Sequence, residues 1–235
     1  MTPNVAVVAP DQFVETAATT IAELIGEAIA ARGACSLALC GGSTPAPVYQ
    51  EIATRSIDWS CVSIYFGDER AVPSGSPDSN FAMASHTLLD LVVIPPSQVH
   101  RMTAECTDLD RSAREYDSLL PPRFDVLLLG VGPDGHTASL FPGGSGVAEP
   151  WRRVVAVAAP PFPLAPPVAR LTITPLVIVA ARHVVVMVRG TNKAAIVQRI
   201  LEGPDQPAML PAQYARRGTW IIDQAAGAQL QSRDN

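Results

Sequence analysis

The sequence predicts an α/β fold built on a mainly parallel sheet. Short apolar runs alternate with segments whose apolar residues recur every three or four positions, the pattern of strands and amphipathic helices in succession. Several apolar runs end in glycine-rich or charged turns. Parallel strands need long, usually helical connections, so this order of elements favours a parallel sheet over an antiparallel one.

The elements of the first half are expected in the order strand, helix, strand, helix, strand, helix, helix, strand. Asp11 is the expected cap of the first helix, which should end near Gly33, and Thr44 with Pro45 begins the second. The expected strands are Val5 to Val8, Ser36 to Cys40, Val62 to Phe66 and Phe124 to Leu129, and the later helices are Asn80 to Leu91 and Asp108 to Leu120.

The second half continues the alternation up to a last strand, which a short helix should follow. The expected strands are Val154 to Val157, Arg170 to Thr174, Val184 to Val188 and Thr219 to Ile222, and the helices are Pro175 to Ala181 and Asn192 to Leu201. The proline-rich segment Pro160 to Pro167 is short and lies between strands, so we interpret it as a loop and expect residues 1–235 to form a single domain.

Composition excludes several classes of protein. With 48% hydrophobic and 17% charged residues, the chain of 235 residues is too apolar for intrinsic disorder, and its 22 prolines and 16 glycines follow no collagen period. The net charge of −5 argues against a nucleic-acid surface. No unbroken apolar stretch reaches the roughly 18 residues of a membrane span.

The sequence also predicts a cytoplasmic protein with reduced thiols. The first basic residue is Arg32, so no charged segment precedes an apolar signal-peptide core. No two cysteines have the C-x-x-C spacing, and a core of this size does not need disulfides. The cysteines are Cys35, Cys40, Cys61 and Cys106.

The first loop that is a candidate for binding or catalysis is Gly41-Gly42-Ser43-Thr44-Pro45, which follows a predicted strand. Ligands of open parallel sheets bind at the carboxyl ends of strands. Glycines let the backbone approach a ligand, and a helix start offers free N–H groups to an anion, so the loop is a candidate phosphate site. A plain glycine turn with a helix cap remains the alternative.

The second loop, Gly67-Asp68-Glu69-Arg70, is either another site element or a solvated turn.

The third loop is Gly130-Val-Gly-Pro-Asp-Gly-His-Thr137, which formally matches the G-x-G-x-x-G pattern of dinucleotide sites. The context is wrong, because Pro142-Gly-Gly144 interrupts the chain where a helix should run. The loop does bring a carboxylate and an imidazole, Asp134 and His136, onto one turn, which suits an oriented general base. The remaining histidines have no metal-site spacing, so we expect no metal.

The fourth loop, Arg189-Gly-Thr-Asn-Lys193, holds the sole lysine of the chain. Lys193 falls in the first turn of a predicted helix, where the helix dipole disfavours a cation. A bound anion would remove this conflict. A surface lysine at a misplaced helix boundary is the alternative.

In this order the four loops resemble the 6-phosphogluconolactonase family, within the superfamily that includes glucosamine-6-phosphate deaminase and ribose-5-phosphate isomerase. The resemblance runs from about Val5 to Ile222. Its most specific part is Gly130 to Pro142, GVGPDGHTASLFP. Further motifs that are similar to the family's are Leu39 to Pro45, Asp68-Glu69-Arg70 with Val72-Pro73 and Ser79-Asn80, and Gly190 to Lys193.

The resemblance implies a modified Rossmann-like, three-layer α/β/α fold and hydrolysis of 6-phosphogluconolactone in the oxidative pentose phosphate pathway, without a cofactor. It implies His136 as general base, assisted by Asp134, with Arg70 against the substrate. The implied substrate-binding residues are Gly41, Gly42, Ser43, Thr44, Asp68, Gly132, Gly135, Arg170 and Lys193. The expected partner is a small sugar-phosphate lactone, not a nucleic acid or a membrane, and monomer and homodimer both stay open.

Two other functions remain to be weighed. A glucosamine-6-phosphate deaminase or isomerase would share the phosphate loops, but its pattern supplies a ring-opening glutamate after the histidine, whereas Thr137 to Pro142 contains no carboxylate. A non-catalytic sugar-phosphate sensor of the kind fused to transcription regulators would need an additional N-terminal domain, and none is expected before Val5.

Overall fold

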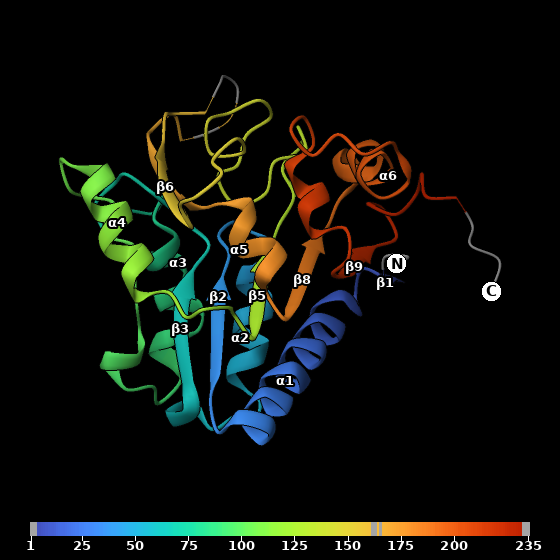
Figure 1. Cartoon of the computed structure of the whole chain (residues 1–235). Helices are drawn as coiled ribbons and strands as arrows, with labels where there is room; N and C mark the ends of the chain where they lie inside the picture. The colour runs from blue at the N-terminus through green and yellow to red at the C-terminus, as the bar shows by residue number, and fades with distance from the viewer. Residues whose placement is uncertain (1–3, 161–163, 165, 232–235) are drawn as a thin grey trace.

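A six-stranded parallel sheet forms the centre of the molecule (Figure 1). The computed structural model describes residues 4–160, 164 and 166–231. All neighbouring strands of this sheet run parallel, in the order β1-β9-β8-β5-β2-β3. The strands are β1 (Asn4–Val8), β2 (Cys35–Leu39), β3 (Val62–Phe66), β5 (Val126–Leu129), β8 (His183–Val188) and β9 (Thr219–Asp223). The predicted α/β fold with a mainly parallel sheet is confirmed.

A small antiparallel sheet, in the order β4-β7-β6, stands beside the carboxyl ends of the large one. Its strands are β4 (Asp68–Arg70), β6 (Val154–Val157) and β7 (Arg170–Ile173). The expectation that Gly67 to Arg70 is a loop is wrong, because Asp68 to Arg70 pair with β7. Three charged residues carry no strand signal, and their partner strand lies about a hundred residues away. Of the segment Pro160 to Pro167, residues 161–163 and 165 lie outside the described residues.

Helices flank the large sheet. They are α1 (Phe13–Arg32), α2 (Pro45–Ala53), α3 (Asn80–Thr87), α4 (Leu109–Leu119), α5 (Pro175–Ala180) and α6 (Ala194–Glu202). Gly33 ends α1 in the left-handed conformation at φ 75°, as expected, and its N–H donates to Ile29. The predicted cap at Asp11 is wrong, since Gln12 takes that position. Helix α3 ends at Thr87, and a separate 3₁₀ turn covers Leu89–Leu91.

The core lies between the sheet and its helices. Strand β5 is buried along its whole length, as expected for a central strand covered on both faces. Helix α1 contributes fully buried side chains at helical spacing, among them Phe13, Ala17, Ile21 and Ile25. None of the helices in the described part of the chain is long and apolar enough to cross a bilayer.

The parallel arrangement gathers the four loops at one end of the sheet. Strand β8 points up in Figure 1, so the carboxyl ends of the strands face the small sheet at the top. The loops after β2, β5 and β8 all leave from this end, and a single residue, Gly67, separates the end of β3 from the start of β4. The expectation of a short helix after β9 is wrong, because the residues that follow Asp223 form turns.

Candidate active site

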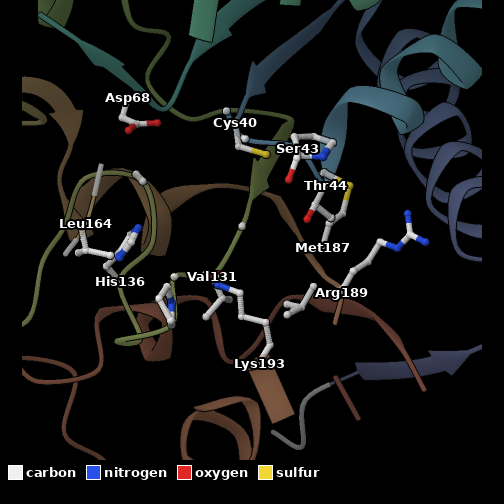
Figure 2. A pocket seen from close by; sticks show the side chains of 18 of the residues that line it. Cys40, Ser43, Thr44, Asp68, Val131, His136, Leu164, Met187, Arg189 and Lys193 are labelled. Carbon is white, nitrogen blue, oxygen red and sulfur yellow. Dashed lines mark hydrogen bonds between the residues drawn. The ribbon is translucent and has the colours of Figure 1, made fainter. Parts of the chain in front are cut away.

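A cavity of about 460 Å³ opens at the carboxyl ends of the strands, and all four loops line it. Figure 2 shows Ser43 and Thr44 with their hydroxyl oxygens toward this space, with His136 and Lys193 on other sides of it. Of the residues predicted for the site, the cavity is lined by Gly41, Gly42, Ser43, Thr44, Asp68, Arg70, Gly132, His136, Arg170 and Lys193. Asp134 and Gly135 are not among the lining residues, but Asp134 contacts His136, which is one of them.

Asp134 holds the His136 side chain. Its Oδ1 atom lies 2.5 Å from His136 Nδ1 and accepts the backbone N–H of the same residue at 3.1 Å. Burial raises the pKa of Asp134, but the hydrogen bond and charge of the His136 ring outweigh it, so the pKa lies below its usual value. Because Asp134 takes Nδ1, Nε2 is the ring nitrogen left to act on a ligand.

Two glycines make this turn fit the histidine. A Cβ on Gly132 would lie 2.1 Å from both Cε1 and Nδ1 of His136, so a side chain there would displace the ring. The Gly132 N–H donates to the carbonyl of His136 at 2.8 Å. Gly135 has φ +89°, a conformation that L side chains rarely adopt. The His136 ring also packs edge-on against Phe141, with centroids 5.1 Å apart.

The second loop contributes two buried carboxylates with different tasks. Asp68 lines the cavity and accepts hydrogen bonds from Ser139 Oγ at 2.6 Å and Asn80 Nδ2 at 3.0 Å. Glu69 instead accepts the N–H groups of Arg70, Asn80 and Phe81 and the Ser79 hydroxyl, and so caps the start of α3. Burial raises the pKa of Glu69 although these bonds act against it. A solvated turn is therefore excluded.

Arg70 and Arg170 stand directly opposite each other on β4 and β7. Like charges at such a cross-strand position repel, which an anion in the cavity would relieve. Burial lowers the pKa of Arg170, Asp68 opposes this, and the charge of Arg70 adds to the lowering. Arg70 Nη1 donates to the Asp78 carbonyl at 2.6 Å.

The loop after β2 comes close to Asn80 because glycine occupies position 41. A Cβ on Gly41 would lie 1.8 Å from Asn80 Oδ1. The Tyr49 hydroxyl fixes the preceding backbone, accepting the Cys40 N–H and donating to the Cys40 carbonyl. Thr44 has helical backbone angles, and its side chain makes no capping hydrogen bond. Its hydroxyl is thus not committed to the α2 cap.

Lys193 reaches the cavity from the loop after β8. It ends a 3₁₀ turn, Thr191–Lys193, and takes the N-cap position of α6 rather than the predicted first turn. Its Nζ donates to the Val131 carbonyl at 2.9 Å. Burial lowers the pKa of Lys193, and the charge of Asp134 partly opposes this. The loops that carry Lys193 and His136 are therefore in direct contact.

Sequence reasoning singled out no role for several residues that support the site. Asn80 and Ser139 hold Asp68, and Asp223 accepts the N–H of Gly190. Asn80 and Ser139 lie within quoted motifs, whereas Asp223 ends an ordinary apolar strand and carries no signal. Arg189 also lines the cavity, but its guanidinium stacks over Phe13 and extends away from His136 (Figure 2).

Within residues 4–160, 164 and 166–231, no group of three or more His, Cys, Asp or Glu side chains could hold a metal ion. The cavity brings together an imidazole paired with a carboxylate, the cationic side chains of Arg70, Arg170 and Lys193, and backbone N–H groups. This set suits proton transfer on a phosphorylated substrate.

Known proteins are similar to this chain over nearly its whole length. The family described as glucosamine-6-phosphate isomerases/6-phosphogluconolactonase matches residues 9–222. The 6-phosphogluconolactonase of Streptomyces coelicolor is 39% identical over 92% of this chain and 90% of its own, and that of Synechocystis sp. is 35% identical over 98% and 99%. The solved 6-phosphogluconolactonase structure from Trypanosoma brucei is similar with a TM-score of 0.87 and 32% identity, covering 97% of this chain and 99% of that one.

Proposed function

The chain belongs to the glucosamine-6-phosphate isomerase/6-phosphogluconolactonase family, and from this premise we propose that it hydrolyses 6-phosphogluconolactone to 6-phosphogluconate with His136 as general base. The observation that carries the proposal is the Asp134–His136 pair at 2.5 Å, beside a cavity that Lys193 also lines. One side of the cavity thus offers a base, and another offers a cation for a phosphate.

His136 would perform both proton transfers. Its Nε2 takes a proton from water, whose oxygen attacks the lactone carbonyl carbon C1 and forms a tetrahedral intermediate. The bond from C1 to the ring oxygen then breaks, and the imidazolium returns the proton to that oxygen. Asp134 stabilises the imidazolium between the two steps and keeps Nε2 directed at the substrate.

The negative charge on the former carbonyl oxygen needs donors nearby. Arg70 and the backbone N–H groups of the glycine turns line the same cavity as His136 and are the candidates for this contact. Asp68 would orient a substrate hydroxyl, since it is a carboxylate at the cavity wall with Ser139 and Asn80 behind it.

The phosphate would lie between Lys193 and the turn Gly41 to Thr44. Helix α2 begins with Pro45-Ala46-Pro47, and proline carries no N–H, so the candidate donors to an anion there are the Ser43 and Thr44 hydroxyls together with the backbone N–H groups of the turn itself. An ammonium in a partly buried site binds a phosphate more strongly than an exposed one does, because water screens the charge less.

The test generates 6-phosphogluconolactone in situ and follows acid release with and without the protein. We expect release well above the spontaneous rate. A parallel assay with glucosamine 6-phosphate follows ammonia, and none is expected because Thr137 to Pro142 offer no carboxylate for ring opening. Ammonia release without lactone hydrolysis would replace the proposal by a deaminase, and binding of 6-phosphogluconate without either reaction would indicate a sensor.

A further inference from the structure

The turn between β8 and α6 depends on one residue for its shape. Gly190 has φ 98° and ψ 149°, and its carbonyl accepts the N–H of Lys193 at 3.0 Å. The N–H and the carbonyl of Gly190 belong to the peptide groups on either side of this residue, so its φ and ψ set the direction in which the chain continues toward Lys193. Whatever holds the Gly190 N–H therefore bears on the position of the Lys193 ammonium.

Asp223 holds that N–H from the neighbouring strand. Strands β8 and β9 are parallel, with Val188 beside Ile222, so Asp223 is the next residue at the carboxyl end of β9. Both of its carboxylate oxygens lie 3.1 Å from the Gly190 nitrogen. Oδ1 also accepts the N–H of Ala226 at 2.8 Å, which anchors the carboxylate in its own loop.

The Asp223 carboxylate is buried and pairs with one arginine. Only 5% of the residue is exposed, and the Nε of Arg189 lies 3.9 Å from Oδ2, within the range of an ion pair but too far for a hydrogen bond. Burial of a carboxylate is costly, so its hydrogen bonds to N–H groups must stabilise it. Asp223 is not among the residues that line the cavity, so it would act on a ligand through its neighbours, the turn at Gly190 and the Arg189 side chain.

We infer that Asp223 is a positioning residue, which holds the Gly190–Lys193 turn in the conformation that captures the phosphate of the substrate. The inference rests on the proposed function in that the turn is taken to bind a phosphate. It adds that affinity for the phosphoryl group depends on a carboxylate that does not touch it. Asp223 holds the Gly190 N–H, the φ and ψ of Gly190 then orient its carbonyl, and that carbonyl holds the Lys193 N–H, which positions the side chain that carries the ammonium.

The experiment measures binding of 6-phosphogluconate and of gluconate by calorimetry, together with KM and kcat for the phosphorylated lactone. In Asp223→Ala we expect the Kd for 6-phosphogluconate and the KM to rise about tenfold, with kcat within about twofold of wild type. Gluconate binding should not change. Asp223→Asn keeps one acceptor oxygen for the Gly190 N–H, so it should recover most of the affinity, and it supplies a second variant if Asp223→Ala does not fold.

Asp125→Ala is the matched control. Asp125 is also a buried carboxylate, 8% exposed, but it lies at the opposite end of the sheet, where it accepts the Ser36 N–H and pairs with Arg32. We expect it to lower the melting temperature without changing the Kd for 6-phosphogluconate. The inference would be overturned if Asp223→Ala and Asp125→Ala lost the same affinity for 6-phosphogluconate. It would also be overturned if Asp223→Ala lost affinity for 6-phosphogluconate and for gluconate by the same factor.

The two proposals fail in different ways. A wild-type chain that binds 6-phosphogluconate but hydrolyses no lactone would refute the proposed function, while the ratio of Kd values between Asp223→Ala and wild type would still decide the role of Asp223. A wild-type chain that hydrolyses the lactone, with an Asp223→Ala variant of unchanged KM and Kd, would refute the inference alone.

Discussion

Asp134 contacts the catalytic candidate His136 twice through one oxygen, at the ring Nδ1 and at the backbone N–H. The second contact fixes where the residue stands in the turn, and the first fixes how its ring is rotated. A carboxylate at Nδ1 also selects the tautomer with the proton on that nitrogen, which leaves Nε2 unprotonated and able to accept a proton from water. The Asp134 carboxylate thus determines both the orientation of the His136 ring and which of its nitrogens carries the proton.

Replacing His136 by alanine should lower turnover by roughly a hundredfold or more, because a positioned general base contributes about 10² to 10⁴ to the rate. The ring is half-buried at the cavity and packs against Phe141, so the variant should fold with a slightly lower melting temperature. Single-turnover rates and thermal unfolding check the two statements. A folded variant with near wild-type turnover would remove His136 from the mechanism.

The Asp134 carboxylate should stabilise the fold in a pH-dependent way. Its pKa in the folded chain lies below the unfolded value of about 3.9, so the folded state binds fewer protons and acidification favours unfolding. The contribution is present above about pH 4 and is lost as the pH falls through the folded pKa. The melting-temperature difference between wild type and Asp134→Asn should therefore be largest near neutral pH and should shrink toward zero in acid. A constant difference would show that the carboxylate charge does not stabilise the fold.

Gly132→Ala should damage catalysis more than binding. The added Cβ would lie 2.1 Å from two atoms of the His136 ring, so the ring must rotate away from Asp134. Misplacement by about 1 Å costs on the order of a hundredfold in rate, while the phosphate end of the cavity stays intact. We expect kcat to fall and the Kd for 6-phosphogluconate to stay close to wild type. Gly75→Ala, with nothing within 4 Å of the added Cβ, is the control.

Local patterns predicted most of the fold. The buried spacing in α1, the stop at Gly33 and the apolar runs of the parallel strands need no distant partner to be recognised. Strand β4 could not be found in this way, because its charged residues become a strand only by pairing with β7. The single-domain organisation over residues 1–235 and a cytoplasmic location stay predictions.

The residues of the site also fall into those that a local motif reveals and those that only long-range strand pairing reveals. His136 could be chosen from the sequence because it shares a glycine-rich turn with Asp134, and Gly132 because the same motif resembles that of a known family. Asp223 could not, since its contact with Gly190 spans parallel strands and only the register of β8 with β9 reveals it. The roles assigned to the individual site residues stay predictions until variants are measured.

Activity should survive exhaustive chelation of divalent metals. Hydrolysis of a lactone needs a base, an oxyanion contact and a proton donor, and His136 with Arg70 or the glycine N–H groups can supply all three. Initial rates before and after dialysis against a chelator check this. A loss of activity that only a divalent ion restores would reveal a metal site.

Lys193 offers a test of the phosphate site that needs no variant. It is the sole lysine, so an amine-selective reagent has only its side chain and the N-terminal amine to modify. Burial lowers the pKa of Lys193, so a larger fraction of it is the reactive neutral amine than for an exposed lysine at the same pH. We expect 6-phosphogluconate to protect Lys193 from labelling and to leave the N-terminal amine reactive, as peptide mapping by mass spectrometry would show.

The corresponding variant separates phosphate binding from support of the neighbouring loop. Lys193→Ala should weaken capture of the phosphorylated lactone by roughly ten- to a hundredfold, since a charge-assisted contact contributes about 1.5 to 3 kcal/mol. It also removes the hydrogen bond to Val131, but that loss affects every substrate alike. The unphosphorylated lactone therefore measures the loop effect, and the ratio between the two lactones measures the phosphate contact. If both lactones are impaired equally, or if 6-phosphogluconate fails to protect Lys193, the phosphate lies elsewhere, and the opposed pair Arg70 and Arg170 becomes its most favourable place.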